Sequence, residues 1–223
     1  MIYGQKTIRL ADACDIRTGY SARTRLDPVE GGGVPAIQLR DLRGEGEFDP
    51  DGSPLYALDG KIERYLAGPG DVLFRSRGEQ NTAVVIASSA KAAVAVLPLL
   101  VLRPNCGLVD PRYLAWFINQ PATQRYFDSC ARGTGLRMIP KSCLENLELS
   151  LPDLPTQQLV VEIDKLSRRE SELLVALAAK KRALTSFALL RQMRNAQPHG
   201  NGTGRMVVRR DRNPAGKSER TNS

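Results

Sequence analysis

The stretch Leu151-Pro152-Asp153-Leu154-Pro155-Thr156-Gln157-Gln158 divides the sequence into two parts of different character. Its prolines hold the chain extended, and Thr156 is suited to cap a helix that follows. From Leu159 onward, neither glycine nor proline occurs before Pro198. This stretch therefore predicts the end of a folded domain and the beginning of a long helix.

The predicted helix, residues 156–190, carries a repeating apolar pattern. Alternate steps of four and three residues from Leu159 meet an apolar residue at seven of nine positions, a spacing that is typical of coiled coils. The helix would be roughly 50 Å long, too long for a domain of this size to cover, so we expect a second helix to pack against it. The apolar residues of this seam are Leu159, Ile163, Leu166, Leu173, Leu177, Leu184 and Phe187.

Two polar residues, Glu170 and Lys180, interrupt the seam. In an antiparallel pair of helices, Glu170 of one chain would approach Lys180 of the other and fix the register. Alternatively, both side chains point to solvent at the edge of the seam. The sequence leaves both interpretations open.

Nearly all strand and turn signals fall in residues 1–155. Short apolar or β-branched runs alternate with turn residues such as Gly31-Gly32-Gly33 and Pro69-Gly70. Asp110-Pro111 predicts an N-cap and the first position of a helix, with an apolar face that runs on toward Tyr126. We therefore predict a mixed α+β domain. Its predicted strands are Thr7–Leu10, Val34–Leu39, Asp71–Phe74, Ala83–Ala87 and Val94–Val101.

The charge distribution supports a division into a domain (1–155), a long dimerisation helix (156–192) and a disordered basic tail (193–223). Residues 1–155 hold 18 Lys+Arg and 18 Asp+Glu, so they contribute nothing to the net charge of +8. Residues 156–190 contribute +2, and residues 191–223 contribute +6. The excess positive charge therefore belongs mostly to a tail rich in Gly and Pro that has too few apolar residues to form a core.

The composition argues against an enzyme. The only histidine, His199, lies in the tail, so the domain has no imidazole for a catalytic triad or a metal site. The four cysteines, Cys14, Cys106, Cys130 and Cys143, form no Cys-x-x-Cys pair, and we expect reduced, mostly core thiols. No phosphate loop or S-adenosylmethionine loop is recognisable. We therefore expect neither a metal nor a cofactor.

The sequence also predicts a cytoplasmic protein without membrane contact. The first residues lack the apolar stretch of a signal peptide. The longest apolar run, Ala92–Leu102, has 11 residues and contains Pro98. That run is too short to span a bilayer.

Arginines gather where loops are predicted, at residues 17–25, 38–41, 75–81 and 132–137. Arg, Gln, Asn and Thr side chains read base edges in the major groove, and backbone amides of glycine turns suit phosphates. For any single arginine a surface salt bridge is the simpler interpretation, whereas the loops together favour a nucleic acid as partner. The predicted DNA-binding residues are Arg17, Thr18, Tyr20, Arg23, Gln38, Arg40, Arg75, Arg77, Asn81, Arg132 and Arg137.

Several of these motifs together are similar to a known family. They are Ile-Arg-Thr-Gly-Tyr at 16–20, Gly-Asp-Val-Leu-Phe at 70–74, Tyr-Leu-Ala-Trp-Phe-Ile-Asn at 113–119 and Leu-Pro-x-Leu-x-x-Gln-Gln at 151–158. This layout, over roughly residues 5–192, resembles the DNA specificity (S) subunit of type I restriction-modification systems. The motif at 151–158 is the most specific of these pieces.

The resemblance implies a non-catalytic subunit that reads DNA. A modification subunit would methylate adenine, and a restriction subunit would cleave where the system has one. The usual S subunit carries two target-recognition domains, each followed by a helix, and its two helices pair antiparallel. This sequence holds one of each, which implies a half-subunit that forms a homodimer and reads an inverted repeat with a non-specific spacer.

Two other classes of protein remain open. One is a stand-alone dimeric DNA-binding regulator, and the other is a coiled-coil scaffold whose arginine loops are inert. A neighbouring methyltransferase gene would argue against the regulator. Salt-dependent binding to duplex DNA would argue against the scaffold.

Overall fold

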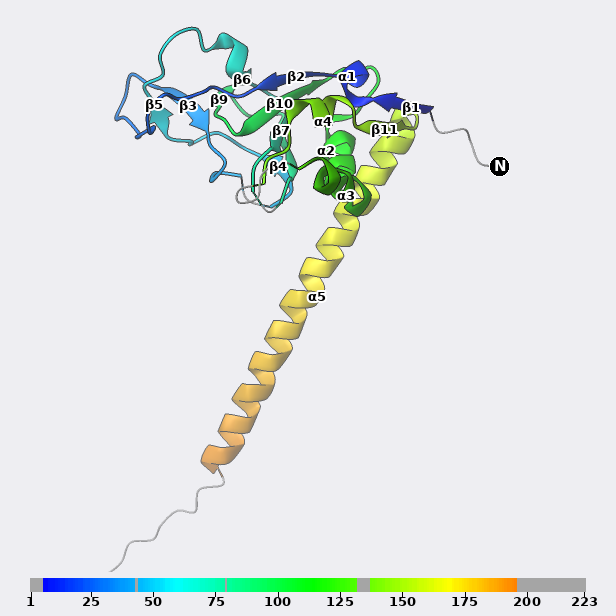
Figure 1. Cartoon of the computed structure of the whole chain (residues 1–223). Coiled ribbons are helices and arrows are strands. Elements are labelled where there is room, and N and C mark those ends of the chain that lie inside the picture. The colour runs from blue at the N-terminus through cyan, green and yellow to red at the C-terminus, as the bar shows by residue number, and fades with distance from the viewer. Residues whose placement is uncertain (1–5, 43, 79, 132–136, 196–223) are drawn as a thin grey trace, which may run out of the picture. The chain divides into compact units, whose positions relative to one another are not determined.

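The computed structural model describes residues 6–42, 44–78, 80–131 and 137–195 (Figure 1). The chain separates into two compact units, 1–170 and 171–223. Helix α5, Leu154–Asn195, begins in the first unit and ends in the second. The mixed α+β class and the long C-terminal helix are confirmed. Among the described helices, none combines the length and apolarity needed to cross a membrane.

A central sheet of five strands forms the middle of the first unit, in the order β2-β10-β7-β8-β4. Its neighbours pair antiparallel, except β4, which runs parallel to β8. The strands are β2 (Cys14–Thr18), β10 (Leu99–Pro104), β7 (Val72–Arg75), β8 (Ala83–Ile86) and β4 (Gly46–Phe48).

A second sheet of four strands has the order β5-β3-β9-β6, and the short strands β1 and β11 form an antiparallel pair. The second sheet consists of β5 (Leu55–Tyr56), β3 (Val34–Ile37), β9 (Ala93–Ala95) and β6 (Leu66–Ala67). The remaining elements are β1 (Lys6–Arg9), α1 (Leu10–Ala13), the 3-10 turn η1 (Glu63–Tyr65), α2 (Pro111–Asn119), α3 (Pro121–Cys130), α4 (Lys141–Glu145) and β11 (Glu148–Leu151).

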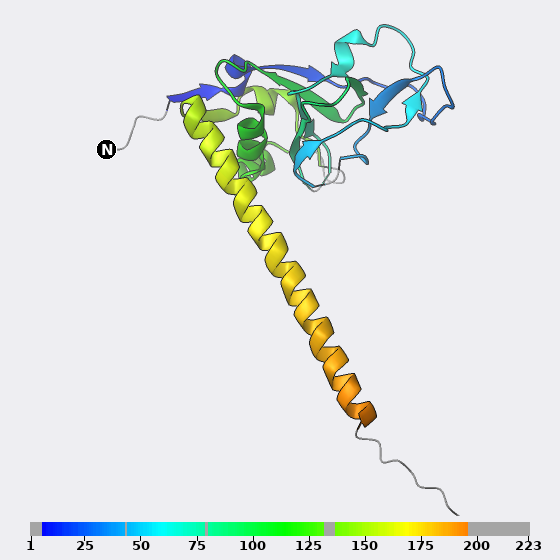
Figure 2. The ribbon, with the colours of Figure 1, turned by 180° about the vertical axis from the view of Figure 1, so that it is seen from behind.

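The alternation of side chains along the central sheet divides the core into layers. Phe74 and Leu102 belong to a cluster with residues of α2 and α3, such as Phe127. Leu73 and Val101, from the same strands, belong to a cluster with residues of the second sheet. Figures 1 and 2 show α2 and α3 at one end of this unit and β3 and β5 at the other. The central sheet is therefore buried on both faces, which explains its continuous apolar runs.

One predicted strand, Val94–Val101, is wrong. β9 ends at Ala95 and β10 begins at Leu99, because the chain turns at residues 96–98, where the Leu99 N–H donates to the carbonyl of Val96 at 3.0 Å. Both strands are buried, so no polar residue marks the turn in the sequence. The other predicted strands are confirmed to within one or two residues at each end.

The predicted helix at Asp110-Pro111 is confirmed as α2. Asp110 caps it by accepting a hydrogen bond from the Arg112 N–H at 2.8 Å. The helix does not run on to Tyr126, because it ends at Asn119 and a second helix begins at Pro121. Proline at 121 lacks the N–H that would continue α2 and disfavours helical backbone at the preceding residue.

Helix α5 begins before the predicted cap. Its first residue is Leu154, and Asp153 rather than Thr156 supplies the capping oxygen, which accepts from the Thr156 N–H at 3.0 Å. Hydrogen bonds from the side chain and backbone of Thr156 hold the pKa of the Asp153 carboxyl below its usual value. A carboxylate at this place suits the positive end of the helix.

The first part of α5 is attached to the rest of its unit by polar contacts. Gln157 is completely buried and accepts a hydrogen bond from the Asp110 N–H at 2.9 Å. Its amide nitrogen donates to the carbonyls of Leu108 at 2.9 Å and Pro152 at 2.8 Å. The Gln157 side chain therefore joins α5 to the loop before α2 and to the end of β11.

Two ion pairs add to this attachment. Arg112 of α2 lies 3.4 Å from Glu162, and Arg168 lies 2.5 Å from Glu45. Arg168 also pairs with Asp164 at 2.6 Å. These exposed or half-exposed pairs contribute little each, so we assign the attachment mainly to Gln157 and to apolar packing.

The side chains of the predicted seam are all solvent-exposed. Their exposed fractions lie between 49% and 69%. A row of apolar side chains of this size is unusual on a monomer surface. The members are Leu159, Ile163 and Leu166 in the first unit, and Leu173, Leu177, Leu184 and Phe187 in the second.

All four cysteines are free, but only half of them lie in the core. Cys14 and Cys143 are buried, Cys130 is half-buried and Cys106 is exposed. Burial raises the pKa of both the Cys14 and the Cys143 thiol to about 12. The two buried thiols therefore stay protonated at neutral pH and act as small apolar groups.

Candidate nucleic-acid interface

The turn at residues 96–98 is the point where three of the predicted arginine loops meet. The Val96 N–H donates to the carbonyl of Ile37 at 2.9 Å, and the Leu97 N–H donates to the carbonyl of Tyr20 at 2.9 Å. The carbonyl of Pro98 accepts from both the backbone N–H and the hydroxyl of Ser76, at 3.2 and 2.5 Å. The loops 17–25 and 75–81, and Ile37 at the end of β3 directly before loop 38–41, are therefore joined through one turn. The Leu97–Pro98 peptide bond of this turn is cis.

Gly19 permits the close approach of β2 to this turn. Its N–H donates to the carbonyl of Leu99 at 3.0 Å. A Cβ at residue 19 would lie 2.8 Å from the Leu99 oxygen, 2.9 Å from the Ala95 oxygen and 2.9 Å from the Leu97 nitrogen. This approach gives a structural reason for the glycine in the Ile-Arg-Thr-Gly-Tyr motif.

The fourth predicted loop reaches the same place. The Ile139 N–H donates to the carbonyl of Ser76 at 2.7 Å, and Arg77 forms an antiparallel bridge with Met138. The carbonyl of Arg137 accepts from the Gly78 N–H at 3.2 Å. Arg132 lies outside the described residues. We call the segments 18–20, 37–40, 75–78, 96–98 and 137–139 the loop cluster.

The arginines of the loop cluster and its flanks differ in their partners. Arg77 and Arg23 are exposed and make no ion pair with another described residue. Arg40 is exposed and donates to the Tyr56 hydroxyl at 3.1 Å. Arg137 forms an ion pair with Asp128. Arg77 and Arg23 are therefore the arginines with the guanidinium group most available for DNA.

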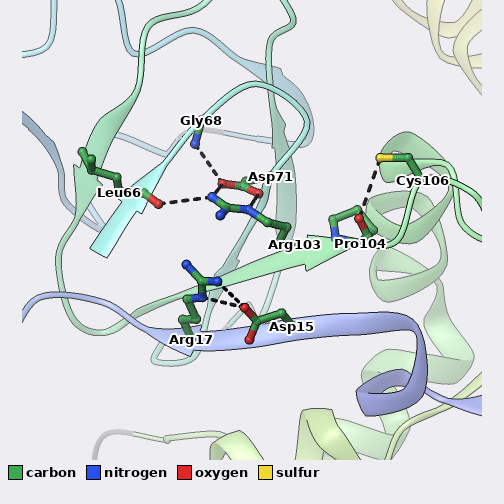
Figure 3. A network of polar contacts seen from close by, with 8 residues as sticks. All are labelled: Asp15, Arg17, Leu66, Gly68, Asp71, Arg103, Pro104 and Cys106. Carbon is green, nitrogen blue, oxygen red and sulfur yellow. Dashed lines mark hydrogen bonds and ion pairs between the residues drawn. The ribbon is translucent and has the colours of Figure 1, made fainter. Parts of the chain in front are cut away.

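Arg17 is paired with an aspartate of its own strand. Its guanidinium donates to Asp15 of the same strand at 2.7 Å, beside the pair formed by Arg103 and Asp71 (Figure 3). Thr18, the next residue, is exposed at the end of β2. The Arg17 side chain therefore forms a surface salt bridge, whereas Thr18 is exposed. The prediction that they contact DNA stays a prediction for both.

The Asp71–Arg103 pair has a structural role that sequence reasoning missed. The Asp71 carboxylate is 3% exposed and accepts from the Gly68 N–H at 2.8 Å and from Arg103 at 2.8 and 2.7 Å (Figure 3). The hydrogen bond to Asp71 raises the pKa of Arg103. An aspartate directly before an apolar strand was the available signal. The acidic residue of the Gly-Asp-Val-Leu-Phe motif therefore fixes the turn before β7.

Asn81 and Tyr20 support the loops from within. Asn81 is completely buried, and its amide donates to the carbonyl of Arg75 at 2.9 Å across the β7–β8 hairpin. The Tyr20 hydroxyl contacts the backbone of Asp59, and its ring packs edge-on against Tyr65 at 5.4 Å between centroids. Neither side chain presents its polar group freely at the surface.

Several buried polar atoms of the predicted residues lack a hydrogen-bond partner within the structure. They are Nε2 of Gln38, Nε of Arg75, Oδ1 of Asn81 and Nε of Arg137, together with the hydroxyl of Thr82. Unsatisfied buried polar atoms are rare in folded proteins, and an ordered water is a common partner for them. Four of these five atoms belong to residues predicted to contact DNA.

No protein-family model matches the chain, and no curated protein sequence matches it either. Solved structures do match. One is a chain from a type I R-M system studied for its complex assembly and conformational transition, at 23% identity and a TM-score of 0.62 over 84% of this chain and 44% of that chain. Another is the HsdS subunit from Thermoanaerobacter tengcongensis, at 24% identity and a TM-score of 0.54 over 82% of this chain and 40% of that chain.

The chain has the fold of an HsdS subunit. The fold implied by the resemblance to type I S subunits is thereby confirmed. The chain spans less than half the length of the solved chains that it matches. The two motifs that carry the resemblance most specifically, at 70–74 and 151–158, contribute the buried Asp71 and Gln157 to the S-subunit fold.

Proposed function

We propose that this chain is a DNA specificity subunit of a type I restriction-modification system. It reads duplex DNA through the loop cluster and directs a partner methyltransferase to an adenine in the target. The observation that carries this proposal is the convergence of the predicted arginine loops on the turn at residues 96–98 within an S-subunit fold. The chain itself performs no catalytic step, and cleavage belongs to a restriction subunit where the system has one.

Charge placement supports a local rather than a general attraction to DNA. Residues 1–155 have no net charge, so the domain as a whole does not draw phosphates. Arg77, Arg23 and Arg40 are exposed at or beside the loop cluster and carry the local positive charge. Arginine pairs with guanine O6 and N7 in the major groove or binds phosphates.

The exposed seam supports a homodimer formed through α5. Each seam residue stabilises pairing by about 1.5–3 kcal/mol when fully buried. Two copies related by a twofold axis would present two domains to DNA. The target would then be an inverted repeat with a spacer that the protein does not read.

The proposed function predicts a methyltransferase gene beside this one, and co-expression of the two genes tests the proposal. Mapping of methylated adenines should reveal a new two-part motif that is absent without the chain. Sequence-specific binding without new methylation would instead indicate a stand-alone regulator. A lack of both would favour the scaffold and contradict the proposal.

Arg77→Ala should weaken binding to the target by about 5–160-fold, because a bidentate contact with guanine is worth about 1–3 kcal/mol. The measurement is a titration of fluorescent duplex DNA at several salt concentrations. Arg9→Ala serves as the control, because Arg9 is exposed on β1 and pairs with Asp12. An equal loss on all sequences with a smaller salt slope would make Arg77 a phosphate contact.

Glu170→Lys should raise the dimer dissociation constant, and addition of Lys180→Glu should restore it. Both residues are exposed on α5, so neither change disturbs a core. Sedimentation equilibrium gives the constant for each variant. If the single change has no effect, or the double change gives no rescue, the two side chains point to solvent and do not fix the register.

A further inference from the structure

Two large apolar side chains stand exposed in the loop cluster. Leu97 is 38% exposed and Met138 is 46% exposed. Among the described residues before α5, Leu108 is the only other large hydrophobic side chain exposed to this degree. Sequence reasoning had assigned only polar side chains to DNA contact.

Leu97, Arg77 and Met138 lie on three neighbouring segments. The hydrogen bond from the Ser76 N–H to the carbonyl of Pro98 extends the pairing of β7 with β10 beyond Arg75 and Leu99. Arg77 follows Ser76 and Leu97 precedes Pro98, so both residues are next in the chain to this hydrogen bond. On the other side, Arg77 forms a bridge with Met138. An exposed guanidinium is thus flanked by an apolar side chain on each side.

The backbone that carries these side chains is fixed. Leu97 donates its N–H to Tyr20, and the residues on both sides of it, Val96 and Pro98, make further backbone hydrogen bonds. Ile139, next to Met138, is completely buried and donates its N–H to Ser76. The exposure of the two apolar side chains therefore belongs to a well-connected part of the fold and not to a free loop end.

We propose that Leu97 and Met138 contact thymine methyl groups in the major groove, on either side of a guanine read by Arg77. This inference rests on the proposed function. The thymine methyl is the one apolar group that a base pair presents in the major groove, and apolar side chains recognise it there. The target would therefore contain thymines within about two base pairs of a guanine.

The width of the row favours the major groove. Arg77 and Met138 lie on segments bridged as in a sheet, about 4.8 Å apart. Leu97 lies in the turn on the other side of Arg77, so the three side chains span more than one such spacing. The major groove is about 12 Å wide and accepts such a row, whereas the minor groove is about 6 Å wide. Apolar wedges that kink DNA act from the minor groove, and this row is too wide for that role.

The test begins with selection of a target by the full-length chain from a library of random duplex DNA. Each thymine of the selected site is then replaced singly by deoxyuridine, which lacks only the methyl group. At two thymines near the guanine, binding should weaken by about fourfold, the value for burial of one methyl-sized group. These substitutions change only the DNA, so the folding of a variant does not enter the result.

Variants then assign each methyl group to a side chain. Leu97→Ala should bind thymine and deoxyuridine DNA equally at one of the two positions, and Met138→Ala should do so at the other. Leu108→Ala is the matched control and should keep the full discrimination at both positions, because Leu108 is exposed outside the loop cluster.

The outcomes separate this inference from the proposed function. If the chain selects no sequence, the proposed function fails. If it selects a site that lacks thymines near a guanine, or deoxyuridine binds as well as thymine, only the inference is overturned. The inference is also overturned if Leu97→Ala weakens binding to both DNAs by the same factor, so that the preference for thymine over deoxyuridine remains at both positions. That result would indicate a wedge or a general packing contact.

Discussion

Gln157→Leu should lower the free energy of unfolding by about 4 kcal/mol. The change leaves the Asp110 N–H and the carbonyls of Leu108 and Pro152 without their hydrogen-bond partner. A buried polar group that loses its partner costs about 1–3 kcal/mol. The Asp110 N–H is buried, whereas the two carbonyls are part-buried and should contribute toward the lower end of that range. For a chain of this size, this loss corresponds to a fall in Tm of about 8–16 °C.

Gln158→Leu is the matched control for this prediction. Gln158 is the next residue on the same helix, but it is exposed, so its replacement should change Tm by no more than about 1–2 °C. Thermal unfolding followed by circular dichroism measures both variants. Equal Tm values for the two variants would show that Gln157 does not attach the first part of α5 to the rest of unit 1–170.

Gly19→Ala should destabilise the fold by about 3 kcal/mol. The new Cβ would lie below 3.0 Å from three backbone atoms, and backbone cannot move aside as a flexible side chain does. Because the contacted atoms belong to Leu97 and its neighbours, the turn at 96–98 must shift. Affinity for the selected DNA should therefore fall together with stability.

Gly68→Ala provides the comparison. A Cβ at residue 68 meets only the Cβ of Ala92, at an ordinary distance of 3.8 Å. Chemical unfolding and DNA titration of both variants give the stability and the affinity. If Gly19→Ala keeps wild-type affinity and stability, the turn at 96–98 does not depend on this close approach.

The sequence predicted individual helices and strands better than the contacts that each of them makes in the fold. Heptad spacing revealed α5 because its exposed seam is periodic, and Asp110-Pro111 revealed α2 because caps act locally. The turn at 96–98 was missed because both flanking strands are buried, so the apolar run hides the break. Sequence signals were therefore sufficient to predict an element where neighbouring residues in the chain determine it.

In the candidate site, too, the sequence predicted local features better than contacts between distant segments. Loop positions predicted which segments lie together: loops 17–25 and 75–81 contact the turn at 96–98, Ile37 before loop 38–41 does so too, and the described end of loop 132–137 contacts segment 76–78. That these loops bind DNA stays a prediction. The partner of each polar side chain depends on contacts between distant segments, so the sequence could not separate exposed Arg77 from paired Arg17 or buried Asn81. Leu97 and Met138 were missed because an apolar residue in a sequence is assumed to be buried.

Selection from random duplex DNA by the full-length chain tests the central claim most directly. The claim is that the loop cluster reads sequence and that α5 pairs two copies. Sequencing of the bound DNA should show two identical half-sites in inverted orientation, separated by a spacer of fixed length and unselected sequence. Binding that is salt-dependent but enriches no sequence would contradict the claim.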